Sequence, residues 1–358
     1  MYRNTKNVPY YVFGRGSLAQ LGDLLKPRRE AVDGPVVYFV DHFFRDHELI
    51  DRLPMEKGDQ LHFVDSSSEP EVTRIDAFKE AVSAADSRTP CCVVGIGGGN
   101  ALDTAKAVAN LLTNPGKAED YQGWELVKNP AVYKIGIPTL SGTGSECSRT
   151  CVLTNIPKNL KLGMNSDYTV YDQLLLDPDL LATVPRDQYF YTGIDTFMHC
   201  VESLQGSYRN AIIDAFSVRA VQLCEEIFLS DDMMSEENRE KMMIASYIGG
   251  MAAGNVGVIH PFSAGLGVVL HVAHGLGNCL ALNVLGDIYP KEYKQFRTMI
   301  ERQDVNLPTG ICKDLTEEQY EGLYRGCIVH EKPLTNALGP DFKQILTREN
   351  LIERYKSI

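Results

Sequence analysis

Apolar and polar positions follow one pattern in the first half of the chain and another in the second. In the first half, short β-branched runs alternate with segments of helical periodicity, such as 74–87 and 101–114. Unbroken apolar runs between amphipathic helices are typical of parallel strands buried on both faces. The first half therefore predicts an α/β domain with a doubly wound parallel sheet. Its expected strands lie within 35–41, 59–65, 90–100 and 133–139.

After residues 177–188 (DPDLLATVPRDQ) the pattern becomes long and helical, with almost no β-branched runs. A chain of 358 residues is also long for one core, because single cores stop growing near ~250–300 residues. We place the change near Pro185. The expected domains are an α/β domain over 1–185 and an all-helical domain over 186–358.

The charge and composition of the chain limit the classes of binding partner that we expect. The chain has 35 Lys and Arg against 47 Asp and Glu, a net charge of −12, and lacks a basic run that would follow a phosphate backbone. We therefore expect no nucleic-acid partner. The first residues lack the apolar core of a signal peptide, and the most apolar later stretch is interrupted by histidine, asparagine and glycine. We expect no membrane association and a cytoplasmic protein.

Nine cysteines occur without a Cys-x-x-Cys pair, mostly in apolar surroundings. This distribution predicts reduced core residues. Cys147 and Cys151, four residues apart, leave open a redox pair or half of a metal site.

Two glycine-rich turns follow predicted strands. Residues 95–106 (GIGGGNALDTAK) open a helix, where backbone N–H groups and the helix N-terminus favour a phosphate. Residues 137–146 (IPTLSGTGSE) gather hydroxyls and glycines in a second turn. Two such turns suggest one elongated phosphate-bearing ligand, although a purely structural tight turn remains an alternative for the first. Asp41, which ends the 35–41 strand, would accept a ribose 2′-hydroxyl and favour NAD, or would cap a helix.

Three of the eight histidines lie in residues 260–275 (HPFSAGLGVVLHVAHG), among small and apolar residues. A histidine in such surroundings must be hydrogen-bonded and neutral, or bound to a metal. Core histidines that hydrogen-bond to backbone carbonyls are therefore one reading. The other reading is a metal site.

Asp195 and His199 support the metal reading, since a spacing of four puts both on one helix face. His260 and His274 would stand ~21 Å apart in one straight helix, too far to share an ion. Gly265 and Gly267 offer a break that would let the chain double back and bring all four side chains together.

These motifs together resemble the iron-containing, or group III metal-dependent, alcohol dehydrogenases. The family's Gly-Gly-Gly-Ser-x-x-Asp-x-x-Lys turn is similar to 97–106, with Asn100 in place of serine. Its Thr-Gly-x-Asp-x-x-x-His helix is similar to 192–199, and its last two metal histidines share the spacing of His260 and His274. The resemblance runs from residues near the start to 349–358 and implies a dehydroquinate synthase-like architecture.

The resemblance also implies a site. Its metal ligands would be Asp195, His199, His260 and His274, binding Fe²⁺ or Zn²⁺, with NAD or NADP as cofactor and a homodimer as the assembly. The expected cofactor-binding residues are Asp41, Gly97, Gly98, Gly99, Asn100, Asp103, Thr139, Leu140, Thr143, Ser145, Val152, Lys161 and Leu180. Lys161 would attract anionic groups of cofactor or substrate, unless it is a solvated surface lysine.

One departure concerns proton handling. The family usually carries a further histidine four residues after the third ligand, where this chain has Ala264. We expect His271, one turn before His274, to replace it as a catalytic residue.

The implied reaction moves a hydride between a primary alcohol, or its aldehyde, and the nicotinamide, with the metal polarising the oxygen. Segments 4–17 and 260–267 are similar to a branch that oxidises the C8 hydroxyl of the sugar acid 3-deoxy-manno-octulosonate, a lipopolysaccharide precursor. The alternatives are a polyol or glycerol-type dehydrogenase, a dehydroquinate-synthase-like lyase, or a non-catalytic metal- or nucleotide-binding protein.

Overall fold

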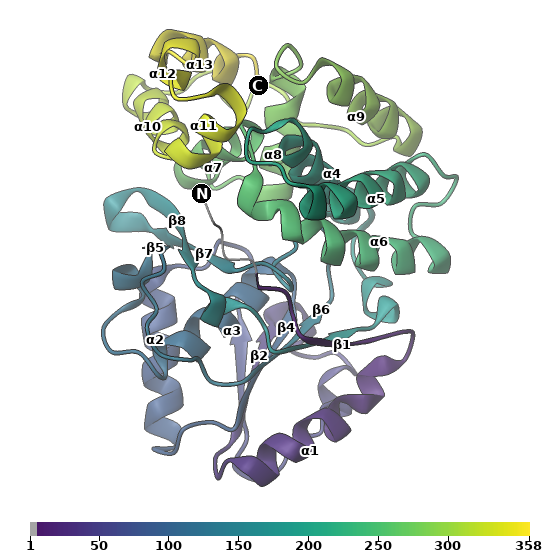
Figure 1. Ribbon diagram of the computed structural model, residues 1–358, viewed down its shortest axis with the longest axis vertical. Coiled ribbons are helices and arrows are strands. Elements are labelled where there is room, and N and C mark those ends of the chain that lie inside the picture. The colour runs from purple at the N-terminus through teal and green to yellow at the C-terminus, as the bar shows by residue number, and fades with distance from the viewer. Residues whose placement is uncertain (1–5) are drawn as a thin grey trace. The chain divides into compact units, whose positions relative to one another are not determined.

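The computed structural model describes residues 6–358, so Asn4 and Thr5 of the segment 4–17 lie outside the described residues. The chain divides into two compact units (Figure 1). The first takes in the described residues up to Leu140 with Ser145–Asn155 and Leu162–Thr183. The second takes in Ser141–Gly144, Ile156–Lys161 and Val184–Ile358. Each is described by itself below.

The first unit contains a six-stranded parallel sheet in the order β1-β9-β6-β4-β2-β3, which confirms the predicted fold class. Its strands are β1 (Tyr10–Phe13), β2 (Val36–Asp41), β3 (Gln60–Val64), β4 (Cys92–Gly97), β6 (Lys134–Pro138) and β9 (Gln173–Leu176). The sequence pattern missed β1 and β9. It also missed a three-stranded sheet of β5 (Gly123–Trp124), β8 (Leu160–Asn165) and β7 (Thr150–Asn155).

Helices cover both faces of the six-stranded sheet, with α1 (Leu21–Ala31) on one side and α2 (Val72–Ala85) and α3 (Gly99–Leu111) on the other (Figure 1). The packing of β2 on both of its faces explains why its first five residues, 36–40, are all apolar. Val37 and Phe39 enter the core beneath α2 and α3, whereas Val36, Tyr38 and Val40 enter the core beneath α1. Side chains alternate across a strand, so a sheet covered on both faces buries every position.

The second unit is helical, as expected from the change of pattern near Pro185. Its first helix, α4, packs against α5 and α8, and α7 packs against α8 and α10. The helices are α4 (Arg186–Gln205), α5 (Ala211–Phe228), α6 (Glu236–Gly249), α7 (Ile259–Leu270), α8 (His274–Val284), α9 (Pro290–Gln303), α10 (Glu317–Ile328), α11 (Glu331–Leu338), α12 (Phe342–Ile345) and α13 (Arg348–Lys356).

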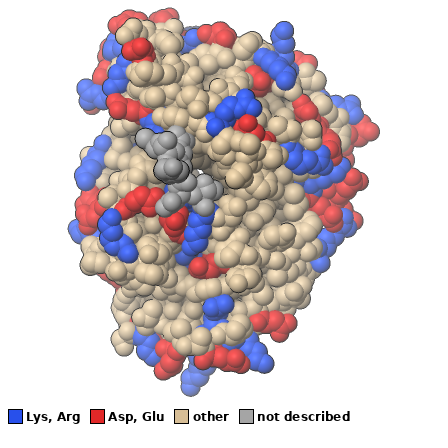
Figure 2. Space-filling view, viewed as in Figure 1, with Lys and Arg blue, Asp and Glu red and all other residues tan. Residues whose placement is uncertain are grey.

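Three further features concern expectations drawn from the sequence: the state of the cysteines, the distribution of surface charge and the length of apolar helices. All nine cysteines lie within residues 6–358, are buried and form no disulfide, including Cys147 and Cys151. Lys and Arg side chains are mixed with Asp and Glu over the face shown in Figure 2. Within residues 6–358 no single helix is long and apolar enough to cross a membrane, although Glu236–Asn255 and Ile259–Leu270, bent by 92°, pass the same test together.

A partly buried ion pair ties α1 to the sheet in the first unit. Asp59 accepts hydrogen bonds from Arg29 on α1 at 2.6 and 2.9 Å and from the backbone N–H of Val36 at 2.9 Å. Burial raises the pKa of the Asp59 carboxyl, but the hydrogen bonds from Arg29 and from the backbone outweigh it and hold the pKa below its ordinary value.

We expect Asp59→Asn to lower the free energy of unfolding at pH 7 by about 2 kcal/mol, because it removes the carboxylate that accepts from two nitrogens of Arg29 and leaves only the more exposed Glu56 as a charged partner. A carboxyl with a depressed folded pKa stabilises the protein above its unfolded pKa of about 3.9, and this contribution is lost as pH falls through the folded value. The gap between wild type and variant in urea unfolding should therefore shrink below about pH 4. Asp86→Asn, which changes a surface pair with Arg88, is the matched control, and a gap independent of pH would contradict this account.

Candidate active site

One face of α4 carries three buried polar side chains. Asp195, His199 and Glu202 are spaced by four and three residues, so they line up on the same side of the helix. Their exposed fractions are 0%, 4% and 1%. A helix that buries two carboxylates and an imidazole needs compensating partners on the elements packed against it.

The partners come from α7 and α8. His260 is the second residue of α7 and His274 is the first residue of α8. The chain reverses at His271, which ends α7 with φ 55° in the left-handed region. The predicted break at Gly265 and Gly267 is wrong, because α7 runs through both.

Gly265 has a packing role inside α7. A Cβ at this position would lie 2.7 Å from the carbonyl oxygen of Leu323 on α10. The glycine therefore permits a close approach of two helices and does not end one.

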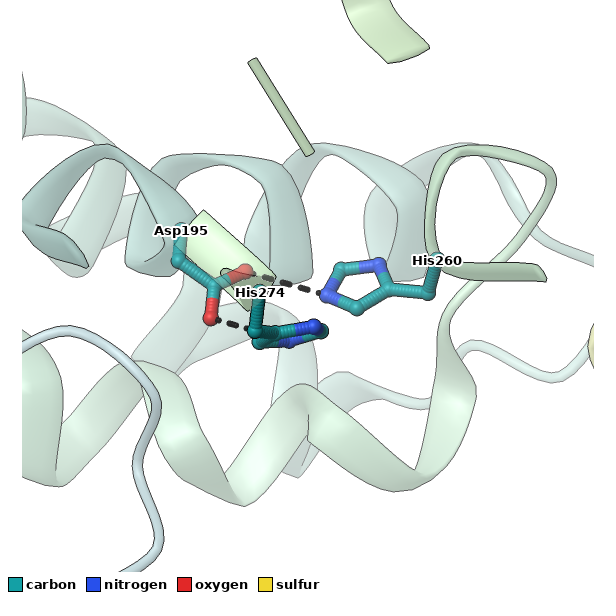
Figure 3. Close-up of side chains that lie close together, drawn as sticks. All are labelled: Asp195, His260 and His274. Carbon is teal, nitrogen blue, oxygen red and sulfur yellow. Dashed lines mark hydrogen bonds and ion pairs between the residues drawn. The ribbon is translucent and has the colours of Figure 1, made fainter. Parts of the chain in front are cut away.

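Asp195, His260 and His274 converge (Figure 3), each offering a ligand atom within 4.8 Å of the others. Nε2 of His260 lies 3.1 Å from Oδ1 of Asp195, and Nε2 of His274 lies 3.4 Å from Oδ2. One carboxylate and two imidazoles from three different helices thus point at one place. This arrangement matches the donor set of a divalent transition-metal site.

His199, the remaining predicted ligand, lies beside this cluster. Its Nε2 is 3.9 Å from Oδ1 of Asp195, and its ring stacks on that of His260 with centroids 4.4 Å apart and planes 14° apart. The structure thus groups three of the four predicted ligands closely and places the fourth against them.

Glu202 and Asn278 support the cluster and were missed by the sequence analysis. Glu202 accepts a hydrogen bond from Nδ1 of His260 at 2.5 Å, which directs Nε2 toward Asp195. Asn278 donates to Oδ1 of Asp195 at 2.7 Å. The sequence spacing indicates both residues, because Glu202 is seven residues after Asp195 and Asn278 is four after His274, which puts each on the helix face of a predicted ligand.

Burial and neighbouring charges strongly shift the pKa values of Asp195, His199 and His260. Burial alone would raise the pKa of the Asp195 carboxyl, but His199 and His274 with a hydrogen bond from His260 hold it well below its usual range. Burial lowers the pKa of His199 to about 3. Burial also lowers that of His260, but hydrogen bonds to Asp195 and Glu202 outweigh it and give a value of about 9. Two buried carboxylates therefore favour a positive charge at this place.

The first glycine turn joins β4 to α3, with Gly98 as the N-cap and Gly99 as the first helical residue. Gly97 has φ 151°, and a Cβ there would lie 2.6 Å from Cβ of Ala101. Glycine is therefore required by the turn itself, as in the structural reading. Asn100 donates to the carbonyl oxygens of Ser66 and Ser68 and borders a cavity of about 360 Å³ beside α2.

Asp103 and Lys106 join this turn to the second glycine loop. Asp103 accepts hydrogen bonds from the Ser145 hydroxyl and, at 2.8 Å, from the Val152 N–H. Lys106, with 0% exposure, donates to the carbonyl oxygen of Ser145 at 2.9 Å. Burial raises the pKa of Asp103. The chain's own groups thus engage Asp103, and its cofactor contact stays a prediction.

Other predicted cofactor residues lie at the carboxyl ends of β4 and β6. Thr139 donates its N–H to the carbonyl oxygen of Gly97 at 3.0 Å, and Leu140 covers Gly98, where a Cβ would lie 3.3 Å from its side chain. Leu180 is buried in the 3₁₀ turn Pro178–Leu181. Thr143 is partly buried, and Lys161, with 7% exposure, is not a solvated surface lysine.

Asp41 was predicted to bind the cofactor and His271 to handle protons, and the structure shows where each side chain lies. Asp41 accepts the N–H of Phe43 at 3.0 Å as a helix cap and the Ser66 hydroxyl at 2.8 Å. The capping alternative is thus realised, and the ribose contact stays a prediction. His271 is exposed at the end of α7, outside the close group of Asp195, His260 and His274. Its catalytic role likewise stays a prediction.

Glycines of the second loop serve packing within the second unit. Gly142 has φ 146°, and a Cβ there would lie 1.6 Å from the carbonyl oxygen of Thr192 on α4. Its N–H donates to Ser246 at 2.8 Å, and its carbonyl accepts from Thr196 at 2.9 Å. This loop residue therefore lies directly against the helix that carries Asp195.

Comparisons with known proteins agree with this site. Residues 9–178 match the iron-containing alcohol dehydrogenase family, and 189–319 match the C-terminal part of the Fe-containing alcohol dehydrogenase family. The sulfoacetaldehyde reductase of Bilophila wadsworthia (strain 3_1_6) is 36% identical over 208 residues, which are 56% of this chain and 53% of the reductase. This match thus spans about half of that relative.

Two further comparisons extend over more of the chain. The NAD-dependent methanol dehydrogenase of Bacillus methanolicus is 29% identical over 75% of this chain and 71% of its own length. The crystal structure of sulfoacetaldehyde reductase from Bifidobacterium kashiwanohense in complex with NAD⁺ shares the fold, with a TM-score of 0.79, 24% identity and coverage of 99% and 98% of the two chains. Two family models thus match most of the chain, and the metal-type cluster lies within the second. The chain belongs to the iron-containing alcohol dehydrogenase family.

Proposed function

We propose that this chain is a metal-dependent oxidoreductase that interconverts a primary alcohol and its aldehyde with NAD(P)⁺ and NAD(P)H. The observation that carries the proposal is the convergence of Asp195, His260 and His274, with Glu202 orienting the central imidazole. Family membership supports the same reaction.

The residues fit a divalent ion. Among the described buried polar atoms, Oδ2 of Asp195 has no hydrogen-bond partner. A buried polar atom without a partner costs about 1–3 kcal/mol, so this oxygen favours an added ligand. Asp195, His260 and His274 would hold the ion, with His199 as a fourth ligand. The bound ion supplies Lewis-acid polarisation of the substrate oxygen.

The chain's own residues orient the groups that would hold the ion. Glu202 accepts the Nδ1 proton of His260 and thereby fixes the imidazole orientation. Aldehyde reduction transfers a hydride from nicotinamide C4 to the carbonyl carbon and a proton to its oxygen, giving the alcohol and NAD(P)⁺. His271 remains our predicted proton-handling residue, since Ala264 has no titratable group.

The substrate class is a small alcohol or aldehyde. The relatives named above are a methanol dehydrogenase and sulfoacetaldehyde reductases, which supports this class. Nothing in these names favours the octulosonate substrate, so the proposal stays at the coarser class. The choice between Fe²⁺ and Zn²⁺, the preference for NAD and the homodimer remain predictions.

Metal removal tests the proposed function. We expect the purified protein to contain about one divalent ion per chain and to consume NADH with short aldehydes. A chelator should abolish this activity, and Fe²⁺ or Zn²⁺ should restore it, because the metal polarises the carbonyl. Net NADH consumption would exclude the lyase. Full activity without metal would contradict the proposal, and bound metal and NAD without turnover of any aldehyde would favour the non-catalytic protein.

We expect Glu202→Gln to weaken metal affinity by about 10–100-fold, because the amide no longer accepts and orients the His260 N–H as a carboxylate does. Competition with a chromophoric chelator measures this affinity. Glu225→Gln, on α5 and hydrogen-bonded to Gln295, is the matched control. A folded Glu202→Gln protein with wild-type affinity would show that Glu202 does not support the site.

Asp41→Ser tests cofactor choice. A carboxylate at this place accepts the ribose 2′-hydroxyl of NADH and repels the 2′-phosphate of NADPH. We expect the ratio of kcat/KM for NADH to that for NADPH to fall at least about tenfold. Asp65→Ser, which changes an exposed aspartate next to the end of β3, should leave the ratio unchanged. A ratio that Asp41→Ser does not move would assign Asp41 to capping alone.

A further inference from the structure

The face of α7 that presents His260 continues with small residues. Ala264 and Gly267 follow at spacings of four and seven, on the same side of the helix. A Cβ at Gly267 would lie 3.8 Å from Nζ of Lys161, so this buried cation stands over the glycine. Seven residues correspond to about 10 Å along a helix axis. A positive charge thus lies a short distance along α7 from the metal-type cluster.

The helix α10 packs against α7, and a second polar group, His330, follows its C-terminal end. A Cβ at Gly322 would lie 3.0 Å from Val269, and a Cβ at Gly326 would lie 2.9 Å from Cα of Gly265. A step of four residues forward on α10 is therefore a step of four back on α7. α10 ends at Ile328, and His330 follows as the N-cap of α11, with its backbone N–H donating to the carbonyl oxygen of Cys327 at 3.3 Å.

Electrostatics agree with this position of His330. Burial lowers the pKa of its imidazole to about 4, and the positive charges of Lys161 and His260 act in the same direction. Its Nε2 is buried and has no hydrogen-bond partner in the described structure. A buried imidazole nitrogen without a partner, next to a buried lysine, is arranged for a ligand oxygen that accepts hydrogen bonds.

We propose that Lys161 and His330 bind the anionic end, a sulfonate or a carboxylate, of a short aldehyde or alcohol whose oxygen faces Asp195, His260 and His274. Ala264, which lies between His260 and Gly267 on this face of α7, would contact the chain that links the two ends. This inference rests on the proposed function and assigns Lys161 and His330 as specificity-determining residues. The charged end adds binding energy that a neutral aldehyde of similar length lacks.

The test compares sulfoacetaldehyde and succinate semialdehyde with propanal, using metal-loaded enzyme and NADH. The wild type should prefer one of the anionic aldehydes over propanal in kcat/KM by at least tenfold. A preference for sulfoacetaldehyde identifies a sulfonate site, and one for succinate semialdehyde a carboxylate site. Lys161→Met and His330→Gln should each lower that preference at least tenfold, mainly through KM. Lys158→Met, on the same segment as Lys161, should leave it unchanged.

A second readout does not depend on turnover. Calorimetry should show 2-hydroxyethanesulfonate or 4-hydroxybutanoate, the alcohol of the preferred aldehyde, binding to the metal- and NAD-loaded protein, with at least tenfold weaker binding in Lys161→Met and recovery in Lys161→Arg. Ala264→His, which would put a larger side chain against the linking chain, should also weaken it.

The outcomes separate the two proposals. Absence of turnover with every aldehyde, in protein loaded with metal and NADH, contradicts the proposed function. Turnover of propanal without preference for either anionic aldehyde, or a preference that survives both Lys161→Met and His330→Gln, overturns the anion site alone.

Discussion

Two carboxylates buried on one face of α4 constrain which side chains the neighbouring helices of the second unit must bring to this face. Asp195 and Glu202 are almost fully excluded from solvent, and an isolated buried carboxylate is costly. Their negative charge is met by imidazoles from α7 and α8, and both helices begin at this place. The reversal of the chain at His271 follows from this requirement, since it lets both helices reach Asp195.

The first unit depends on a comparable buried pair. Lys106 is fully buried, and its ammonium donates to the carbonyl oxygens of Ser145, in the second glycine loop, and of Ser148, just after it. Asp103 on the same helix accepts from the Ser145 hydroxyl and from the Val152 N–H. Removing either side chain would leave the other buried without its charge partner. The Gly-Gly-Gly-Asn-x-x-Asp-x-x-Lys pattern is thus as much a device for holding two loops together as a phosphate turn.

Much of this organisation follows from the sequence because burial leaves a regular trace. Strand β2 is apolar at every buried position, and the spacing of Asp195 and His199 matches one helix face, so both were predicted. Short strands such as β1 are exposed on most of their side chains and leave no such trace. The helix break was misplaced because a glycine such as Gly265 often interrupts a helix. Here the glycine lies inside α7 and permits the close approach of α10. Glu202 and Asn278 were missed because their contacts join different helices.

Gly142 couples the movement of its loop to that of α4. With a backbone contact too tight for a methyl group on one side and hydrogen bonds to Ser246 and Thr196 on the other, this loop residue has little freedom to move without α4. Thr192 and Thr196 lie within one turn of Asp195. A ligand that displaces the loop must therefore strain or relieve the helix that carries Asp195. If that displacement changed the affinity of this helix for an ion, thermodynamic reciprocity would require the ion to alter the ligand's affinity by the same factor.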